Sequence, residues 1–200
     1  MRMMKKKFMI YNIGENNFCS HVDAIHAENP KSDLHTGEIV NDVISRINAS
    51  GIISTVSRTK MDLNRSRNDS NAPAIDEYRE TINEIIESKS IILPDNTLSK
   101  NYLHMAIHGM KDDRGTEFEI GTYSGMSCSP EIERWFLSRL RTISTKIGLN
   151  KIFQGDQSKC FHRDGDPSSG YIGYGDKFHT IQIEICKKWR KIKKKRLWIF

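Results

Sequence analysis

The sequence has few cysteines, and none of them stand in a pattern that binds metal or builds a disulfide framework. The four are widely separated, at Cys19, Cys128, Cys160 and Cys186, with no Cys-x-x-Cys spacing. This arrangement argues against a structural zinc knuckle and against a disulfide-stabilised secreted domain. It is typical of a protein kept in a reducing compartment, so we expect a cytoplasmic location.

Long apolar runs are also missing, so we expect no membrane-spanning segment. The basic start of the chain is followed by only a short apolar segment, which Asn12 and Gly14 interrupt, and we expect no signal peptide. No internal repeat and no zinc-finger, RNP or helix-turn-helix pattern is present, which makes nucleic acid an unlikely partner. A chain of 200 residues suits one α/β domain with a substantial core.

The net charge of +6 is unevenly distributed. Eight lysines and arginines lie between positions 187 and 196, and no acidic residue follows Glu184. Because this segment carries more positive charge than the whole chain has net, the remainder is acidic overall. We therefore divide the chain into a domain, 1–186, and a basic C-terminal tail, 187–200. The tail reads either as a solvated helix end or as an electrostatic contact with nucleic acid or an anionic membrane.

Short apolar segments alternate with segments of helical periodicity along the chain. We expect strands at 8–13, 22–25, 52–56, 102–108, 118–122 and 180–185, and helices at 36–47, from about 74 to 86, and at 130–143. Such alternation predicts a single α/β domain with a mixed, mostly parallel sheet flanked by helices on both faces. The glycine- and serine-rich stretch 153–176 has little periodicity and is typical of a functional loop.

Two expected strands end in histidine, at His26 and His108, and Asp33 follows the first of them just before a helix. In open α/β sheets ligands bind beyond the carboxyl ends of the strands. Two imidazoles and one carboxylate form the open ligand set that a catalytic zinc ion uses. The alternative is that each histidine satisfies a nearby carbonyl and that Asp33 only stabilises the start of the helix.

A competing pair lies close by. His35 and Glu38 have the H-x-x-E spacing by which zinc carboxypeptidases supply two ligands, although both are also ordinary residues for the first turn of a helix. His21 and His104 are expected to be structural or exposed.

Three further polar positions are candidates for chemistry. Asn64 and Arg65 follow a strand, and a guanidinium can hold a carboxylate through two hydrogen bonds, although Arg65 could instead pair locally with Asp62. Glu184 lies between isoleucines on an alternating strand and could act as a general base, or could simply face solvent. Arg163, in the irregular stretch, could stabilise a developing oxyanion.

Taken together, these stretches resemble the N-formylglutamate amidohydrolase family, which is related in design to the zinc carboxypeptidases and to phage poly-γ-glutamate hydrolases. The matching segments are 33–36, 57–65, 107–109, 118–122 and 181–185, and they span most of the chain. The Asp-Leu-Asn-Arg motif at 62–65 and the Gln-Ile-Glu-Ile strand at 182–185 are the most specific.

The resemblance implies a phosphorylase/hydrolase-like α/β fold with one zinc ion, for which His26, Asp33 and His108 match the ligands. The sequence departs from the family pattern after His26, where Ala27 and Glu28 stand in place of a His-Gly-Gly or His-Ser-Gly turn. This departure leaves the alternative ligand pair, residues 35 and 38, open.

The resemblance also implies roles around the metal. Asn64 and Arg65 match the pair that holds a substrate carboxylate, and Glu184 matches the general base. The predicted function is zinc-dependent hydrolysis of an amide bond in a small acidic substrate of the N-formyl- or N-acyl-glutamate type. The alternatives are a poly-γ-glutamate or peptide-type zinc hydrolase, and a catalytically inactive relative that binds polyanions through its basic tail.

Overall fold

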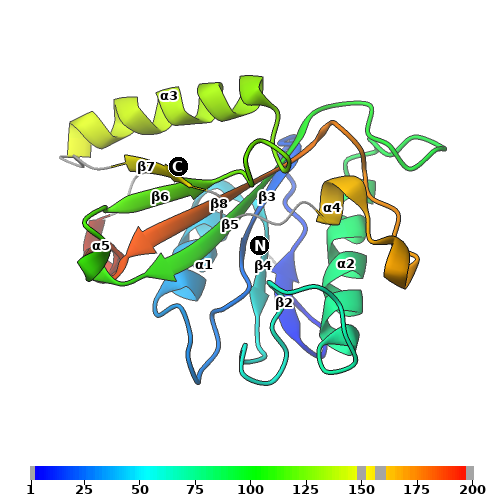
Figure 1. Cartoon of the computed structure of the whole chain (residues 1–200), viewed down its shortest axis with the longest axis horizontal. Helices are drawn as coiled ribbons and strands as arrows, with labels where there is room; N and C mark the ends of the chain where they lie inside the picture. The colour runs from blue at the N-terminus through cyan, green and yellow to red at the C-terminus, as the bar shows by residue number, and fades with distance from the viewer. Residues whose placement is uncertain (1–2, 148–151, 156–160, 197–200) are drawn as a thin grey trace.

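An eight-stranded mixed sheet organises the fold (Figure 1). The computed structural model describes residues 3–147, 152–155 and 161–196. Its strands are β1 (Met4–Lys5), β2 (Met9–Asn12), β3 (Ser20–Ala24), β4 (Ser50–Ser54), β5 (Tyr102–Met110), β6 (Phe118–Gly121), β7 (Ile152–Gly155) and β8 (Phe178–Cys186). Its α-helices are α1 (Thr36–Ile47), α2 (Ala72–Glu87), α3 (Pro130–Ile147), α4 (Phe161–Asp164) and α5 (Lys187–Arg196).

The strand order is β1-β2-β4-β3-β5-β8-β6-β7. The centre, from β4 through β3 and β5 to β8, is parallel, whereas β1, β2 and β6 join their inner neighbours antiparallel. Helices α2 and α4 cover one face, and α1, α3 and α5 lie on the other (Figure 1). This architecture confirms the predicted α/β class with a mixed sheet between two helical layers.

Side-chain alternation gives the two faces of β5 and β8 different characters. Ile107 of β5, with Ile181 and Ile183 of β8, joins the apolar core beneath α1 and α3. The other face carries His104 and His108 on β5, and their register partners on β8 are Thr180 and Glu184. A row of polar side chains therefore runs along the middle of the sheet toward the carboxyl ends of its parallel strands.

The bounds of α1 agree with those expected, whereas β4 begins and ends two residues earlier than expected, at Ser50 and Ser54. Helix α1 is capped at its C-terminus by Asn48, which adopts the left-handed conformation with φ 49°. Gly51 lies inside β4, where an added Cβ would be 2.6 Å from Ile44 Cδ1 of α1. The close packing of α1 on β4 favours glycine at this position. The strand thus includes Ser50 and Gly51, which precede its β-branched residues.

The stretch expected to be irregular contains short ordered elements. Strand β7 pairs parallel with β6, and α4 is followed by a 3-10 turn at Pro167–Ser169. Residues 156–160, which include Cys160, and the last part of the basic tail, 197–200, lie outside the described residues. Within the described part of the chain, no helix is both long enough and apolar enough to cross a bilayer.

Candidate metal centre

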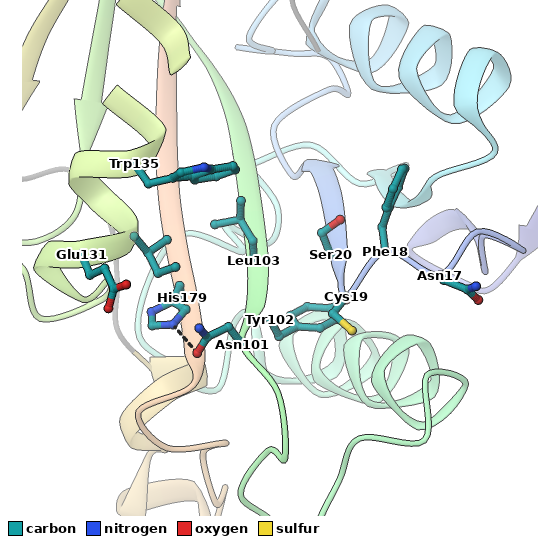
Figure 2. Close-up of a pocket in the computed structure, with 11 residues that line it drawn as sticks. Asn17, Phe18, Cys19, Ser20, Asn101, Tyr102, Leu103, Glu131, Trp135 and His179 are labelled. Atoms are coloured by element: carbon teal, nitrogen blue, oxygen red, sulfur yellow. Dashed lines mark hydrogen bonds between the residues drawn. The ribbon is translucent and has the colours of Figure 1, made fainter. Parts of the chain in front are cut away.

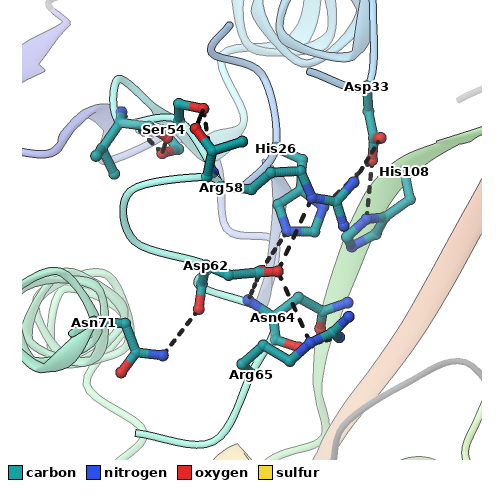
Figure 3. Close-up of polar contacts among 12 residues, drawn as sticks. His26, Asp33, Ser54, Arg58, Asp62, Asn64, Arg65, Asn71 and His108 are labelled. Atoms are coloured by element: carbon teal, nitrogen blue, oxygen red, sulfur yellow. Dashed lines mark hydrogen bonds and ion pairs between the residues drawn. The ribbon is translucent and has the colours of Figure 1, made fainter. Parts of the chain in front are cut away.

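His26, Asp33 and His108 come together at the carboxyl ends of β3 and β5 (Figure 3). Asp33 Oδ2 lies 3.4 Å from His26 Nδ1 and 3.2 Å from His108 Nδ1. All three residues are buried, His26 completely. The sequence-based grouping of these residues therefore corresponds to one compact cluster of two imidazoles around one carboxylate oxygen.

The chain places these groups with backbone hydrogen bonds. His26 follows the end of β3, and a turn returns the chain so that the Asp33 N–H donates to the His26 carbonyl at 2.8 Å. The Asp33 carbonyl in turn accepts from the Thr36 hydroxyl, at 2.7 Å, and from the Thr36 N–H at the start of α1. Asp33 is thus held between the strand and the helix.

The spacing of the cluster fits a tetrahedral metal ion. Ligand atoms about 2.0–2.1 Å from zinc stand about 3.3 Å apart at the corners of a tetrahedron. The measured separations of 3.2 and 3.4 Å match that edge. The rings of His26 and His108 lie at 75° with centroids 4.9 Å apart, so they are not stacked on each other. Three protein ligands would leave a fourth position for water or substrate.

Asp62 fixes the ring of His26 in the form that metal binding needs. His26 Nε2 lies 2.8 Å from Asp62 Oδ1. An ionised carboxylate only accepts hydrogen bonds, so Nε2 carries the proton and Nδ1 keeps its lone pair. Nδ1 is buried and has no hydrogen-bond partner among the described residues. A carboxylate behind a ligating histidine is the usual second layer of a zinc site.

Hydrogen bonds stabilise the ionised carboxylates of Asp33 and Asp62. Burial would raise the pKa of Asp62, but the hydrogen bonds from His26 and from the Asn64 N–H lower it to about 2. Burial likewise opposes ionisation of Asp33, yet the adjacent His108 and His26 hold the pKa of that carboxyl well below its usual range. Arg58 Nη1 also donates to Asp33 Oδ1 at 3.2 Å. Both carboxylates are therefore negative at neutral pH.

Asp62 was expected only as a local partner of Arg65, and Arg58 was part of a matching segment without a role. The Arg65 Nε lies 3.9 Å from Asp62 Oδ2, farther than His26. The spacing between 26 and 62 in the sequence gives no sign of this contact, because it depends on the parallel pairing of β3 with β4.

We expect Asp62→Asn to weaken metal binding by about 10- to 100-fold, the usual cost of losing such a second-layer carboxylate. The amide can still accept a hydrogen bond but lacks the charge that makes the imidazole a strong donor to the metal. Competition with a chromophoric chelator measures the affinity. Asp42→Asn, which removes a surface carboxylate paired with Arg46 on α1, is the matched control. Equal affinity in both variants would contradict the role of Asp62.

Glu184 lies beside the cluster on the neighbouring strand. It is the register partner of His108 in the parallel pair of β5 with β8. Register partners project from the same face of the sheet, about 4.8 Å apart between strands. Gln182 Nε2 donates to Glu184 Oε1 at 3.1 Å, which orients the carboxylate. The glutamate is half-buried, so it is accessible to a bound molecule.

Asn64 and Arg65 lie on the same loop as Asp62, next to His26 (Figure 3). The Asn64 N–H donates to Asp62 Oδ1 at 2.9 Å, and Arg65 Nη1 donates to the Asn64 carbonyl at 3.1 Å. The Arg65 side chain is 61% exposed, so most of its donors face solvent. The loop therefore presents a guanidinium near the cluster.

Arg163, by contrast, is not brought to this group. Its guanidinium donates to the Met126 carbonyl and to Asp176, close to where β8 begins, whereas Glu184 lies near the end of that strand. The alternative pair, His35 and Glu38, forms a contact of 3.1 Å with a largely exposed glutamate and belongs to no cluster of three possible ligands in the described chain.

A second group of possible ligands, His21, Asp23 and His104, lies under α2. Here the two imidazole rings are nearly parallel, at 8°, with centroids only 4.3 Å apart. Rings this close cannot share a plane without overlapping, so a metal ion cannot lie in the plane of both. His104 Nε2 instead pairs with Asp23 at 2.8 Å, and the Tyr78 hydroxyl donates to the same carboxylate. This group is a structural hydrogen-bond network.

A roomier hollow among the described residues lies elsewhere. A groove of about 510 Å³ opens at the beginnings of β3, β5 and β8, between Phe18 and Trp135, with Glu131 and the His179–Asn101 pair at its edge (Figure 2). It lies at the opposite end of the parallel strands from His108, and it contains neither of the two clusters of possible metal ligands. The groove is therefore separate from the candidate metal centre.

No family model and no curated protein sequence matches the chain. The fold is similar to that of N-formylglutamate amidohydrolase from Ralstonia eutropha JMP134, with a TM-score of 0.60 and 13% identity over 90% of this chain and 86% of that one. It is also similar to a gene product of Agrobacterium tumefaciens, with a TM-score of 0.59 and 11% identity over 92% and 86% of the two chains. At these identities the shared property is the α/β fold.

Proposed function

We propose that this protein is a zinc-dependent hydrolase that cleaves an amide bond in a small acidic substrate of the N-formyl- or N-acyl-glutamate type. The observation that carries the proposal is the cluster of His26, Asp33 and His108, with ligand spacing suited to zinc, beside the half-buried Glu184. The similarity of fold to an N-formylglutamate amidohydrolase supports the choice of reaction.

A zinc ion held by His26, Asp33 and His108 would supply polarisation of an amide carbonyl and a bound water molecule with a pKa of about 7. The ligand set is chemically suitable, because neutral imidazoles and a carboxylate are ordinary zinc ligands. His26 and His108 would contribute nitrogen, and Asp33 would contribute oxygen and one negative charge.

Glu184 is proposed as the general base. Its carboxylate would accept the proton from the attacking water and then return it to the leaving amine. Gln182 keeps the carboxylate oriented through the hydrogen bond at 3.1 Å. Hydrolysis of an amide requires both proton transfers, and in this arrangement one residue would serve both.

Arg65, with Asn64, is proposed to hold a carboxylate of the substrate. A planar guanidinium forms two parallel hydrogen bonds with a carboxylate, which fixes the orientation as well as the position of the bound molecule. The Arg65 side chain is exposed, so its guanidinium has N–H donors available for such a contact. Binding energy gained away from the scissile bond would thereby orient the amide toward the metal.

The proposal is tested by measuring release of glutamate from N-formyl- and N-acetyl-glutamate, with short γ-glutamyl peptides and N-formyl-leucine as comparison substrates. We expect turnover of the acidic substrates that is lost with a chelator and restored by zinc. Preference for γ-glutamyl peptides would identify the polyglutamate type of hydrolase. Absence of any zinc-dependent turnover across this set would contradict the proposed function.

A further inference from the structure

Arg190 distinguishes helix α5 from a solvated basic tail. Lys187, Lys188 and Lys191 of this helix are exposed, but Arg190 is only 5% exposed. The helix contacts α1, β5 and β8, and Trp189 packs against the apolar core beneath α1. Burying a guanidinium is costly unless its charge and donors are used, so its position calls for an explanation.

The guanidinium lies against Gly109. A Cβ built on this glycine would stand 1.7 Å from Arg190 Nη1 and 2.4 Å from its Cζ, so only glycine leaves the space that the arginine occupies. Arg190 Nη1 also donates to the Ile185 carbonyl at 2.8 Å. Gly109 directly follows His108 on β5, and Ile185 directly follows Glu184 on β8. The guanidinium therefore joins the two strands immediately behind the candidate centre.

The charge of Arg190 lies close enough to this centre to interact with its carboxylates. Its Nε has no hydrogen-bond partner among the described residues. Burial lowers the pKa of Arg190, and the carboxylates of Asp33 and Glu184 are the two strongest influences in the opposite direction. A guanidinium stays protonated in proteins, so the side chain provides a permanent positive charge.

We propose that Arg190 is a positioning residue of the active site, which locks α5 onto the ends of β5 and β8 and places a fixed positive charge behind Asp33 and Glu184. Its catalytic consequence rests on the proposed function, whereas its place against Gly109 and its effect on the metal do not. The C-terminal helix would then belong to the site.

The contact with Gly109 is tested by a double-mutant cycle. Gly109→Ala should lower the melting temperature by about 5 °C or more in the wild-type background, because the methyl group displaces the guanidinium. In the Arg190→Ala background the same change should have little further effect, because the three atoms nearest that Cβ all belong to Arg190. Equal effects of Gly109→Ala in both backgrounds would overturn the proposed packing.

The charge is tested by metal affinity. Arg190→Met should bind zinc about three- to tenfold more tightly, because a like charge near a divalent ion repels it. Arg190→Lys, which keeps the charge, should stay near wild type, and Lys191→Met, which removes an exposed charge of the same helix, is the control. An unchanged or weaker affinity in Arg190→Met would overturn the electrostatic role. If that variant does not fold, a tenfold change in Arg190→Lys would overturn it instead.

Turnover separates this inference from the proposed function. In an active enzyme, Arg190→Met should lower kcat at least about tenfold with little change in KM, and Arg190→Lys should recover part of the loss. An equally large loss of kcat in Lys191→Met would overturn a specific role of Arg190. If wild-type protein hydrolyses no amide, the proposed function fails, and the stability cycle and zinc affinity still decide the role of Arg190.

Discussion

His108→Ala is expected to lose zinc, with an affinity reduced at least about 100-fold, because removing a direct ligand costs more than the 10- to 100-fold loss typical of second-layer partners. Wild-type protein should contain close to one zinc ion per chain and not two, since the parallel rings of His21 and His104 cannot share an ion. Metal analysis of dialysed protein measures the stoichiometry, and competition with a chromophoric chelator measures the affinity.

His35→Ala is the matched histidine control for this prediction. His35 contacts Glu38 at the start of α1 and belongs to no cluster of three possible ligands in the described part of the chain. The His35→Ala protein should therefore retain the metal. If His35→Ala lost zinc and His108→Ala kept it, the H-x-x-E pair would be the true ligands and the centre described here would be wrong.

Glu184→Gln is expected to keep zinc but lose about 10²- to 10⁴-fold in kcat, the usual contribution of a general base. Glutamine is nearly isosteric and can still hydrogen-bond with Gln182, but it cannot take up a proton. Steady-state kinetics with an N-acyl-glutamate substrate, together with metal analysis of the same sample, measures the effect.

Two outcomes would argue against this role for Glu184. Loss of zinc in Glu184→Gln would make the glutamate part of the metal-binding group, and unchanged kcat would exclude it as the base. Glu131→Gln provides the control, because Glu131 lies on the exposed groove at the opposite end of the strands (Figure 2).

Local sequence signals were sufficient to predict that His26, Asp33 and His108 lie close together. His26 and His108 end apolar segments, and Asp33 precedes an amphipathic helix, so the topology of parallel strands predicts that all three meet at one edge of the sheet. The altered turn after His26 does not prevent this, because a backbone hydrogen bond from Asp33 to the His26 carbonyl closes the turn with other residues.

Contacts that depend on tertiary packing could not be read in the same way. Nothing near Asp62 in the sequence indicates that it reaches His26, since their contact arises from neighbouring strands that are distant in the chain. The burial of Arg190 could not be predicted from composition, because a run of lysines and arginines favours a solvated segment. Its burial against Gly109 distinguishes it from the exposed lysines of the same helix.

The location of Arg163 also could not be predicted from the sequence. Its loop was expected near the chemistry, but α4 lies against the first half of β8, where His162 contacts Phe178 and His104. The direction in which an irregular segment returns to the sheet is set by packing, which sequence periodicity does not record. The structure consequently leaves Arg163 with Asp176 and the Met126 carbonyl as partners.

The most direct test is anomalous diffraction at the zinc edge from crystals of the zinc-loaded protein. We predict one peak, about 2.0–2.2 Å from a ring nitrogen of His26, a ring nitrogen of His108 and a carboxylate oxygen of Asp33. A peak between His21 and His104, a peak at His35 and Glu38, or no bound zinc would contradict the account.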